Sequence, residues 1–140
     1  MPNDDRGVDV GSANPPFLVA QIGDNSPESG SVSFAATRSG LSDNVLRDNF
    51  VLIDQNDGIP RRIVAGYTVV YPGCRTRGHE HSDREEVYYF LAGKGAMVIG
   101  DKTVNVTGGT AVYVAPGPFH TVHCDGPIPL TFLWVTSDIT

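Results

Sequence analysis

The stretch that decides the fold runs from residue 73 to residue 93 and reads Gly73-Cys-Arg-Thr-Arg-Gly-His79-Glu-His81-Ser-Asp-Arg-Glu-Glu86-Val-Tyr-Tyr-Phe-Leu-Ala-Gly93. His79 and His81 are one residue apart, so on an extended segment their side chains project from the same face. Glu86 begins the next strand after a short polar turn, and hairpin geometry could bring its carboxylate back toward both imidazoles. Two imidazoles and a carboxylate suit a first-row divalent metal ion.

Short apolar runs separated by turn residues continue through most of the chain. Of the 140 residues, 16 are glycine and 10 are proline, which favours many strands over long helices. Gly100-Asp101 is typical of a two-residue hairpin turn. Ile63–Tyr71 is apolar on both alternating rows, as expected of a strand buried on both faces. The expected strands are Phe50–Ile53, Ile63–Tyr71, Arg77–His81, Val87–Leu91, Ala96–Ile99, Thr103–Val106, Ala111–Val114, Phe119–Cys124 and Leu130–Val135. The pattern predicts an all-β, antiparallel sandwich or small barrel.

The N-terminal part of the sequence has a different character. Residues 1–33 are mostly polar and turn-rich apart from Phe17–Ala20, and we expect an arm that adds an edge strand to a neighbour or stays mobile. Residues 34–140 then form a single barrel domain. Leu41–Asn49 is expected to form a short helix with Ser42 as its N-cap.

The composition excludes several classes of protein. The formal net charge of −6 and the lack of a basic stripe argue against binding to nucleic acid. Cys74 and Cys124 fit neither a disulfide framework nor a Cys-x-x-Cys motif. The N-terminus is polar, and no apolar run approaches the length of a membrane span. We therefore expect a cytoplasmic protein that acts on a small-molecule substrate and contacts neither nucleic acid nor a membrane.

A second segment strengthens the interpretation of the first. It reads Gly109-Thr-Ala-Val-Tyr-Val-Ala115-Pro116-Gly117-Pro-Phe-His120 and places a histidine after a Pro-Gly turn. Together the two segments resemble the two motifs of the cupin family. The first motif is complete, whereas in the second Ala115 replaces a usual proline and Cys124 replaces a usual asparagine. The resemblance covers roughly residues 50–136.

The resemblance implies a jelly-roll β-barrel with His79, His81, Glu86 and His120 around one metal ion. The alternative is a metal-free cupin that uses the same cluster for hydrogen-bonded packing. Iron, manganese, nickel, cobalt, copper and zinc all tolerate this donor set, so the identity of the metal stays open. Cupins commonly pair through sheet edges, which makes a homodimer the expected assembly.

Several residues beside these four are predicted to have lesser roles. Glu85 should point away from the metal by alternation, and His123 should lie on the face opposite to His120. Cys124 shares the face of His120, so it is either a pocket-lining thiol or a small buried hydrophobic residue. No role is assigned to Cys74. Arg75 and Arg77 flank the ligand segment and either clamp a substrate carboxylate or are ordinary surface residues.

The aromatic residues are expected mostly in the core, and alternation from Glu86 indicates that Tyr88 and Phe90 could instead line the pocket. An aromatic and aliphatic lining with few spare acid–base groups suits an oxygen-using enzyme, such as a dioxygenase, acting on a hydroxy-carbonyl metabolite. Glu86 and Tyr88 are its candidate catalytic residues.

Two other functions remain open. The first is a metal-dependent isomerase, cyclase or lyase, because Arg77-Gly-His-Glu-His81, Glu86-Val-Tyr-Tyr and Gly93-Lys-Gly95 are similar to the cupin-type phosphoglucose isomerases of archaea. The second is a cupin that binds a small ligand without catalysis.

Overall fold

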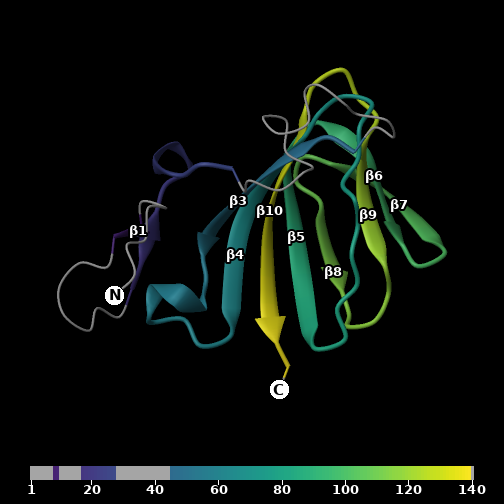
Figure 1. The fold of residues 1–140 in the computed structure, drawn as a ribbon. Helices are drawn as coiled ribbons and strands as arrows, with labels where there is room; N and C mark the ends of the chain where they lie inside the picture. Colours follow the sequence, from purple (N-terminus) through teal and green to yellow (C-terminus); the bar gives the residue numbers. More distant parts are fainter. Residues whose placement is uncertain (1–7, 10–16, 28–44, 140) are drawn as a thin grey trace.

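A computed structural model describes residues 8–9, 17–27 and 45–139 (Figure 1). Ten strands are present in these ranges, together with two short 3₁₀ turns, η1 (Ile22–Asp24) and η2 (Gln55–Asp57). The strands are β1 (Val8–Asp9), β2 (Val19–Ala20), β3 (Arg47–Ile53), β4 (Ile63–Val70), β5 (Arg84–Ala92), β6 (Lys94–Ile99), β7 (Lys102–Thr107), β8 (Ala111–Val114), β9 (His120–Cys124) and β10 (Leu130–Asp138).

Two antiparallel sheets enclose the core. The larger sheet has the order β3-β4-β10-β5-β8, and the smaller has the order β7-β6-β9. Because β5 belongs to one sheet and β6 to the other, the chain crosses between the sheets at Gly93, where φ is +89°. Between them lies a core of apolar side chains, among them Val70, Phe90, Met97, Val106, Val122, Leu130 and Phe132. This is the antiparallel jelly-roll fold that the sequence predicts.

Most of the expected strands are present with small changes in their ends. The β6–β7 hairpin turns at Gly100 and Asp101 with Ile99 paired to Lys102, as predicted, and Gly100 has φ +59°. Along β5, Glu86, Tyr88 and Phe90 point inward, whereas the residues between them point outward. The outward row of β4 is less covered than expected, since Ile63 is exposed.

The predicted helix over Leu41–Asn49 is wrong where the structure describes it. Strand β3 begins at Arg47 and pairs with β4 from Arg47–Val70 onward, so pairing with a neighbour overrides the weak helical pattern. Val45 forms an isolated parallel bridge with Arg75. Residues 41–44, which include the expected N-cap Ser42, lie outside the described residues.

The expected strand Arg77–His81 is not continuous. Its segment makes only isolated bridges, between Arg75 and His123 and between His79 and His120. Gly78 lies between these bridges with φ +86°, a left-handed conformation that interrupts a regular strand. The segment still runs alongside β9, which is what places its histidines.

The described part of the N-terminal arm includes two short strands. β2 pairs with β1 in an antiparallel ribbon, and Figure 1 shows this ribbon on the β3 side of the larger sheet. The rest of residues 1–33 lies outside the described ranges, so both the edge-strand role and the boundary at residue 34 stay predictions. In the described residues no helix has the length and apolar character that a membrane crossing needs.

Candidate metal centre

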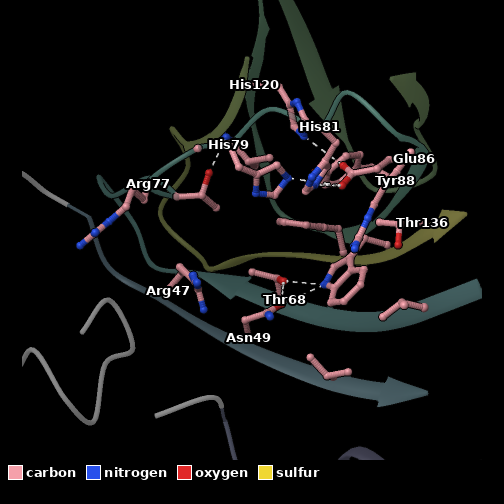
Figure 2. A pocket seen from close by; sticks show the side chains of 18 residues that line it. Arg47, Asn49, Thr68, Arg77, His79, His81, Glu86, Tyr88, His120 and Thr136 are labelled. Atoms are coloured by element: carbon pink, nitrogen blue, oxygen red, sulfur yellow. Dashed lines mark hydrogen bonds and ion pairs between the residues drawn. The ribbon is translucent and has the colours of Figure 1, made fainter. Parts of the chain in front are cut away.

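Three imidazoles converge on the carboxylate of Glu86, which points inward from β5 of the larger sheet, and one of them, His120, comes from β9 of the smaller sheet (Figure 2). The Nε2 atoms of His79 and His81 lie 3.3 Å and 2.9 Å from Glu86 Oε1. The Nε2 atom of His120 lies 3.0 Å from the other carboxylate oxygen, Oε2. The structure thus brings together all four residues that the two motifs single out.

The backbone fixes how His79 and His120 face each other. The N–H of His79 donates to the carbonyl of His120 over 3.1 Å, and the N–H of His120 donates back over 2.9 Å. Gly78 makes this approach possible, because a Cβ at that position would lie 2.4 Å from Thr121 Cγ2 and 2.9 Å from the carbonyl oxygen of His120. A side chain there would push the two ligand segments apart.

The Pro-Gly turn of the second segment fixes the backbone of His81 and the ring of His120 by hydrogen bonds. The N–H of Gly117 donates to the carbonyl of His81 over 2.6 Å, which ties the two motifs together. His120 Nδ1 lies 3.0 Å from the carbonyl oxygen of Pro118. A carbonyl can only accept, so Nδ1 carries a proton there and the tautomer leaves Nε2 as the atom available to a metal.

Burial and hydrogen bonds set the charges of the cluster. Burial would raise the pKa of Glu86, but hydrogen bonds from His120, His79 and Tyr88 outweigh it and hold the pKa well below its usual range. Burial also opposes protonation of His120, yet the contacts with Glu86 and Pro118 raise its pKa. Burial lowers the pKa of His81, with the nearby His79 adding to the effect. The carboxylate is therefore ionised at neutral pH.

Tyr88 is a hydrogen-bond partner of the Glu86 carboxylate. Its side chain is buried, lines the cavity, and donates a hydrogen bond to Glu86. Burial and the charge of Glu86 together raise the pKa of Tyr88 well above 10, so the phenol keeps its proton. Tyr88 is thus a donor at neutral pH, not a base.

The donor atoms fit a metal ion. One ligand atom from each of His79, His81 and Glu86 lies within 4.8 Å of the others. His120 adjoins this group through the second oxygen of Glu86. Imidazole nitrogens with a buried carboxylate are donors that first-row divalent ions accept, and Pro118 supplies the outer partner that a metal-bound imidazole usually has.

The cluster opens into a cavity of about 510 Å³. Its lining is more polar and more cationic than the sequence predicts, because three arginines contribute to it. Among the described lining residues, Glu86 is the one carboxylate. The lining residues are Arg47, Asn49, Val51, Val64, Thr68, Thr76, Arg77, Gly78, His79, His81, Arg84, Glu86, Tyr88, His120, Val122, Phe132, Trp134 and Thr136.

Sequence reasoning missed two of these arginines. Arg47 escaped because its segment was assigned to a helix; alternation along a strand from Arg47 to Val51 would have pointed it inward with Asn49. Arg84 begins β5 and lies two residues before Glu86, so it shares the face of that ligand. Its Nε atom lies 3.4 Å from Asp138 Oδ1.

The other predicted residues divide between the cavity and the core. Arg77 lines the cavity, whereas Arg75 pairs with His123 in a backbone bridge and does not line it. Tyr88 lines the cavity as expected, but Phe90 is fully buried in the core. Glu85 is exposed and accepts a hydrogen bond from Tyr113.

His123 and the two cysteines take no part in the cluster. His123 Nε2 lies 2.9 Å from Thr121 Oγ1, away from the cavity, as alternation predicts. Cys124 is a buried core residue, and its thiol donates to the carbonyl of Ile128. Cys74 packs against the same core, and burial raises the pKa of its thiol. Of the two alternatives for Cys124, the buried hydrophobic residue is the one observed.

Curated relatives share part of this sequence. An uncharacterized protein of Methanocaldococcus jannaschii is 34% identical over 65 residues, which cover 46% of this chain and 52% of that protein. A glucose-6-phosphate isomerase of Pyrococcus furiosus is 42% identical over 79 residues, covering 47% of this chain and 42% of that protein. The chain therefore spans about half the length of the curated relatives it matches.

The fold and the sequence family agree. The structure is similar to that of a predicted oxalate decarboxylase from Thermotoga maritima, with a TM-score of 0.62 and 22% identity over 66% of this chain and 81% of that one. The sequence model of the cupin domain matches residues 66–136, which hold both motifs and all four convergent side chains. This chain is a member of the cupin family.

Proposed function

We propose that this cupin is a mononuclear-metal enzyme that rearranges a small anionic hydroxy-carbonyl compound without net oxidation, as an isomerase, cyclase or lyase does. One observation carries this proposal: a single cavity combines the convergent imidazole and carboxylate cluster with Arg47, Arg77 and Arg84. Guanidinium groups hold carboxylates and phosphates through paired hydrogen bonds, so the cavity suits an anion.

The three arginines favour the isomerase, cyclase or lyase over the oxygen-using enzyme that the sequence favours. The sequence favours an oxygen-using enzyme, because it predicts a pocket lined by aromatic and aliphatic side chains with few cations. The cavity is not poor in cations, since its described lining includes three arginines beside several hydroxyl groups. In a chain with a net charge of −6, a locally cationic cavity selects small anions over neutral molecules.

In this proposal the four convergent side chains hold one divalent ion. When bound, such an ion polarises a substrate carbonyl and acidifies the adjacent C–H or O–H group. At neutral pH Glu86 is ionised and Tyr88 keeps its proton, so in this proposal Glu86 is the group that accepts a proton and Tyr88 the group that donates one. These two residues are the candidate catalytic pair.

Two cations lie near one end of the cavity. Figure 2 shows Arg47, from β3, and Arg77, from the segment that leads to His79, at the side of the view away from Glu86. This separation suits a substrate whose carbonyl lies at the cluster and whose anionic group lies some way along the molecule. A sugar phosphate has this form, and the relative from Pyrococcus furiosus named glucose-6-phosphate isomerase supports testing that class first.

The floor of the cavity is neutral and hydrogen-bonded. Asn49 Oδ1 accepts from the Thr68 hydroxyl over 2.6 Å and from Trp134 Nε1 over 2.9 Å. The indole face and the hydroxyl beside it can pack against a polyhydroxylated carbon chain. In this proposal the floor is the neutral surface against which the carbon chain of the substrate lies, beside the arginines.

An oxygen-using enzyme remains the second candidate. The observation in its favour is the donor set, because three imidazoles and one carboxylate leave about two positions of a six-coordinate ion for substrate and dioxygen. His79 is also half exposed, so the cluster is open to small molecules from the cavity. Oxygen consumption separates this candidate from the first.

The proposal is tested on protein purified without chelator and analysed for metal content. The protein is then loaded with iron, manganese, nickel, cobalt, copper or zinc and offered sugar phosphates and hydroxy acids under anaerobic conditions. We expect turnover without oxygen. Turnover that requires oxygen would support the second candidate. Retained metal with no turnover in either atmosphere would indicate a ligand-binding cupin.

The anionic substrate is tested by changing one charge. Arg77→Gln should raise KM roughly tenfold or more, since a hydrogen bond to a charged group contributes about 1.5–3 kcal/mol. Arg61→Gln is the matched control, because Arg61 is exposed and does not line this cavity. Equal effects of the two substitutions would contradict the assigned role of Arg77.

A further inference from the structure

The two cysteines lie opposite each other across two neighbouring segments of the chain. The segment that leads to His79 runs antiparallel to the last residues of β9, and within it Arg75 forms a bridge with His123. One position along from this bridge, the same register pairs Cys74 with Cys124. The two residues are far apart in the sequence, so the sequence alone gives no reason to pair them, whereas the fold brings them together.

Main-chain hydrogen bonds fix the distance between these two residues. The N–H of Cys124 donates to the carbonyl of Cys74 over 2.9 Å. On the other side of the bridge, the N–H of Thr76 donates to the carbonyl of Val122, also over 2.9 Å. This pattern makes the cysteines a hydrogen-bonded pair of the antiparallel ladder, in which the Cα atoms are about 5.5 Å apart. Disulfides join residues whose Cα atoms are about 4.4–6.8 Å apart, so the pair is within bridging distance.

Both side chains lie on the same side of the ladder. Residues directly opposite each other in an antiparallel pair project from one face. Cys124 belongs to the apolar core, and Cys74 packs against that core. Burial, and then the charge that Cys124 carries when ionised, raise the pKa of the Cys74 thiol. An effect of one thiol on the other requires that the two groups are close, in agreement with the register.

Neither thiol is held by a strong hydrogen bond. Cys74 Sγ lies 3.6 Å from the carbonyl oxygen of Pro72, and Cys124 Sγ lies 3.3 Å from that of Ile128. A thiol is a weak donor, so little is lost when either side chain rotates. The N–H of Cys74 donates to the carbonyl of Tyr71 instead of that of Cys124. This end of the ladder can therefore adjust to the geometry that a disulfide requires.

The two thiols differ in their access to solvent. Cys74 is partly exposed, whereas Cys124 is only 2% exposed. A reagent in solution reaches the sulfur of Cys74 first, and Cys124 is then the neighbouring group that attacks it. An accessible cysteine beside a second, resolving cysteine is the arrangement found in redox-sensitive sites. The raised pKa of Cys74 keeps its thiol protonated at neutral pH, so we expect the reaction to be slow.

We propose that Cys74 and Cys124 form a redox modification site, at which a low-molecular-weight disulfide converts the two thiols to an intramolecular disulfide. Each protein thiol gives up its proton to water before it reacts. The thiolate of Cys74 attacks one sulfur of the small disulfide and expels the other as a thiolate. The thiolate of Cys124 then attacks Cys74 Sγ and expels the second small thiolate. The chain loses two electrons, and the small disulfide gains them.

The disulfide closes a loop that contains the whole candidate metal centre. All four convergent residues lie between Cys74 and Cys124 in the sequence, together with β5 to β8. Closing a long loop restricts the unfolded chain, so the oxidised form should be more stable than the reduced form. The link also holds the start of the first ligand segment against the end of β9. The site does not depend on the proposed activity and is tested without turnover.

Oxidised glutathione tests the proposal on the folded chain. The reduced protein is incubated with an excess of it, remaining thiols are blocked with a maleimide under denaturing conditions, and the intact mass is measured. We expect the unsubstituted chain to lose two hydrogen atoms and to take up no maleimide, and peptide mapping to link Cys74 to Cys124. Cys74→Ser and Cys124→Ala are the controls. Each should keep a free thiol or carry one glutathione, without an internal link.

Thermal unfolding tests whether the native fold accommodates the link. The Tm of the oxidised chain should exceed that of the reduced chain by about 10 °C, and oxidant should not raise the Tm of Cys74→Ser. Each comparison is made within one variant, so the cost of the substitution itself cancels. If Cys124→Ala does not fold, Cys74→Ser remains as the control, because it changes one atom at a partly exposed position.

Three outcomes would overturn the proposal. The first is a chain that keeps both thiols free, or carries glutathione on them, after equilibration with excess oxidant. The second is a link between two chains, seen as a doubled mass without reductant. The third is an internal link that does not raise Tm, because the disulfide then forms in unfolded chains and strains the native structure.

Discussion

Both ring nitrogens of His120 have a hydrogen-bond partner, so metal binding at this histidine is linked to the loss of a proton. Nδ1 donates to Pro118, and Nε2 faces the ionised Glu86. The raised pKa of His120 means that, without metal, Nε2 carries a proton over a wider range of pH than in a free histidine. A metal ion at Nε2 must displace that proton.

Metal binding is therefore expected to release protons near neutral pH. Isothermal titration calorimetry in buffers with different ionisation enthalpies measures the number released. Because the pKa of His120 is raised, the release should be largest below that pKa and fall as the pH rises through it, with metal affinity increasing in step. Identical binding enthalpies in all buffers at pH 6 would contradict this assignment.

Single ligand substitutions separate the four convergent residues from their neighbours. His81→Ala and His120→Ala should each lower metal affinity roughly tenfold or more, because each removes a nitrogen from the cluster. His123→Ala is the control, since His123 bonds to Thr121 away from the cavity. Elemental analysis after dialysis gives the metal content. Loss of metal from His123→Ala would mean that its face is wrongly assigned.

For single residues, the sequence predicts the four-residue cluster but not the other side chains that line the cavity. The four convergent residues could be predicted because their spacing belongs to two motifs that lie near each other in this fold. Arg47 could not, because no motif contains it and its inward direction depends on a strand that the local sequence does not favour. Residues that line a cavity by alternation are found only once the strand is known.

Among the elements, the segment before β5 depends on Gly78. Alanine is unfavourable at this position for two reasons: φ is +86°, and a Cβ would lie too close to Thr121 and His120. We expect Gly78→Ala to lower the free energy of unfolding by about 1–3 kcal/mol and to weaken metal binding. Chemical denaturation and metal titration measure the two effects.

Gly73→Ala is the matched control for that change. Gly73 also has a positive φ, +77°, but a Cβ there would meet nothing within 4 Å. The control therefore reports backbone strain without a clash, and its cost should be near 1 kcal/mol with metal affinity unchanged. If both variants lose the same stability and affinity, the close approach of the two ligand segments is not what Gly78 provides.

The strands themselves show which signals in a sequence are local. β5 through β10 were found because alternation and turn residues agree in each of them. β3 was found only in part, since its first residues, Arg47 to Asn49, lack an apolar alternation and extend through pairing with β4. The His79–His81 segment was expected to be a regular strand, but a single glycine with positive φ divides it. Pairing with a distant strand decided the first case, and the backbone conformation of one glycine decided the second.

For the whole molecule, the homodimer expected from the family resemblance makes thermal stability depend on protein concentration. If two chains associate, unfolding also separates them, and Tm rises with protein concentration. We expect this rise for the unsubstituted chain. Differential scanning calorimetry at several concentrations measures it. A Tm that stays constant over the whole range would argue for a stable monomer.

The two histidine segments and the Pro-Gly turn are fastened to one another by main-chain hydrogen bonds, from His79 to His120 and from Gly117 to His81. If an ion binds here, its donors are preorganised, because the entropic cost of bringing them together is borne when the polypeptide folds. A site tied together in this way would adjust little to ions of different size, and we expect it to discriminate between them for that reason.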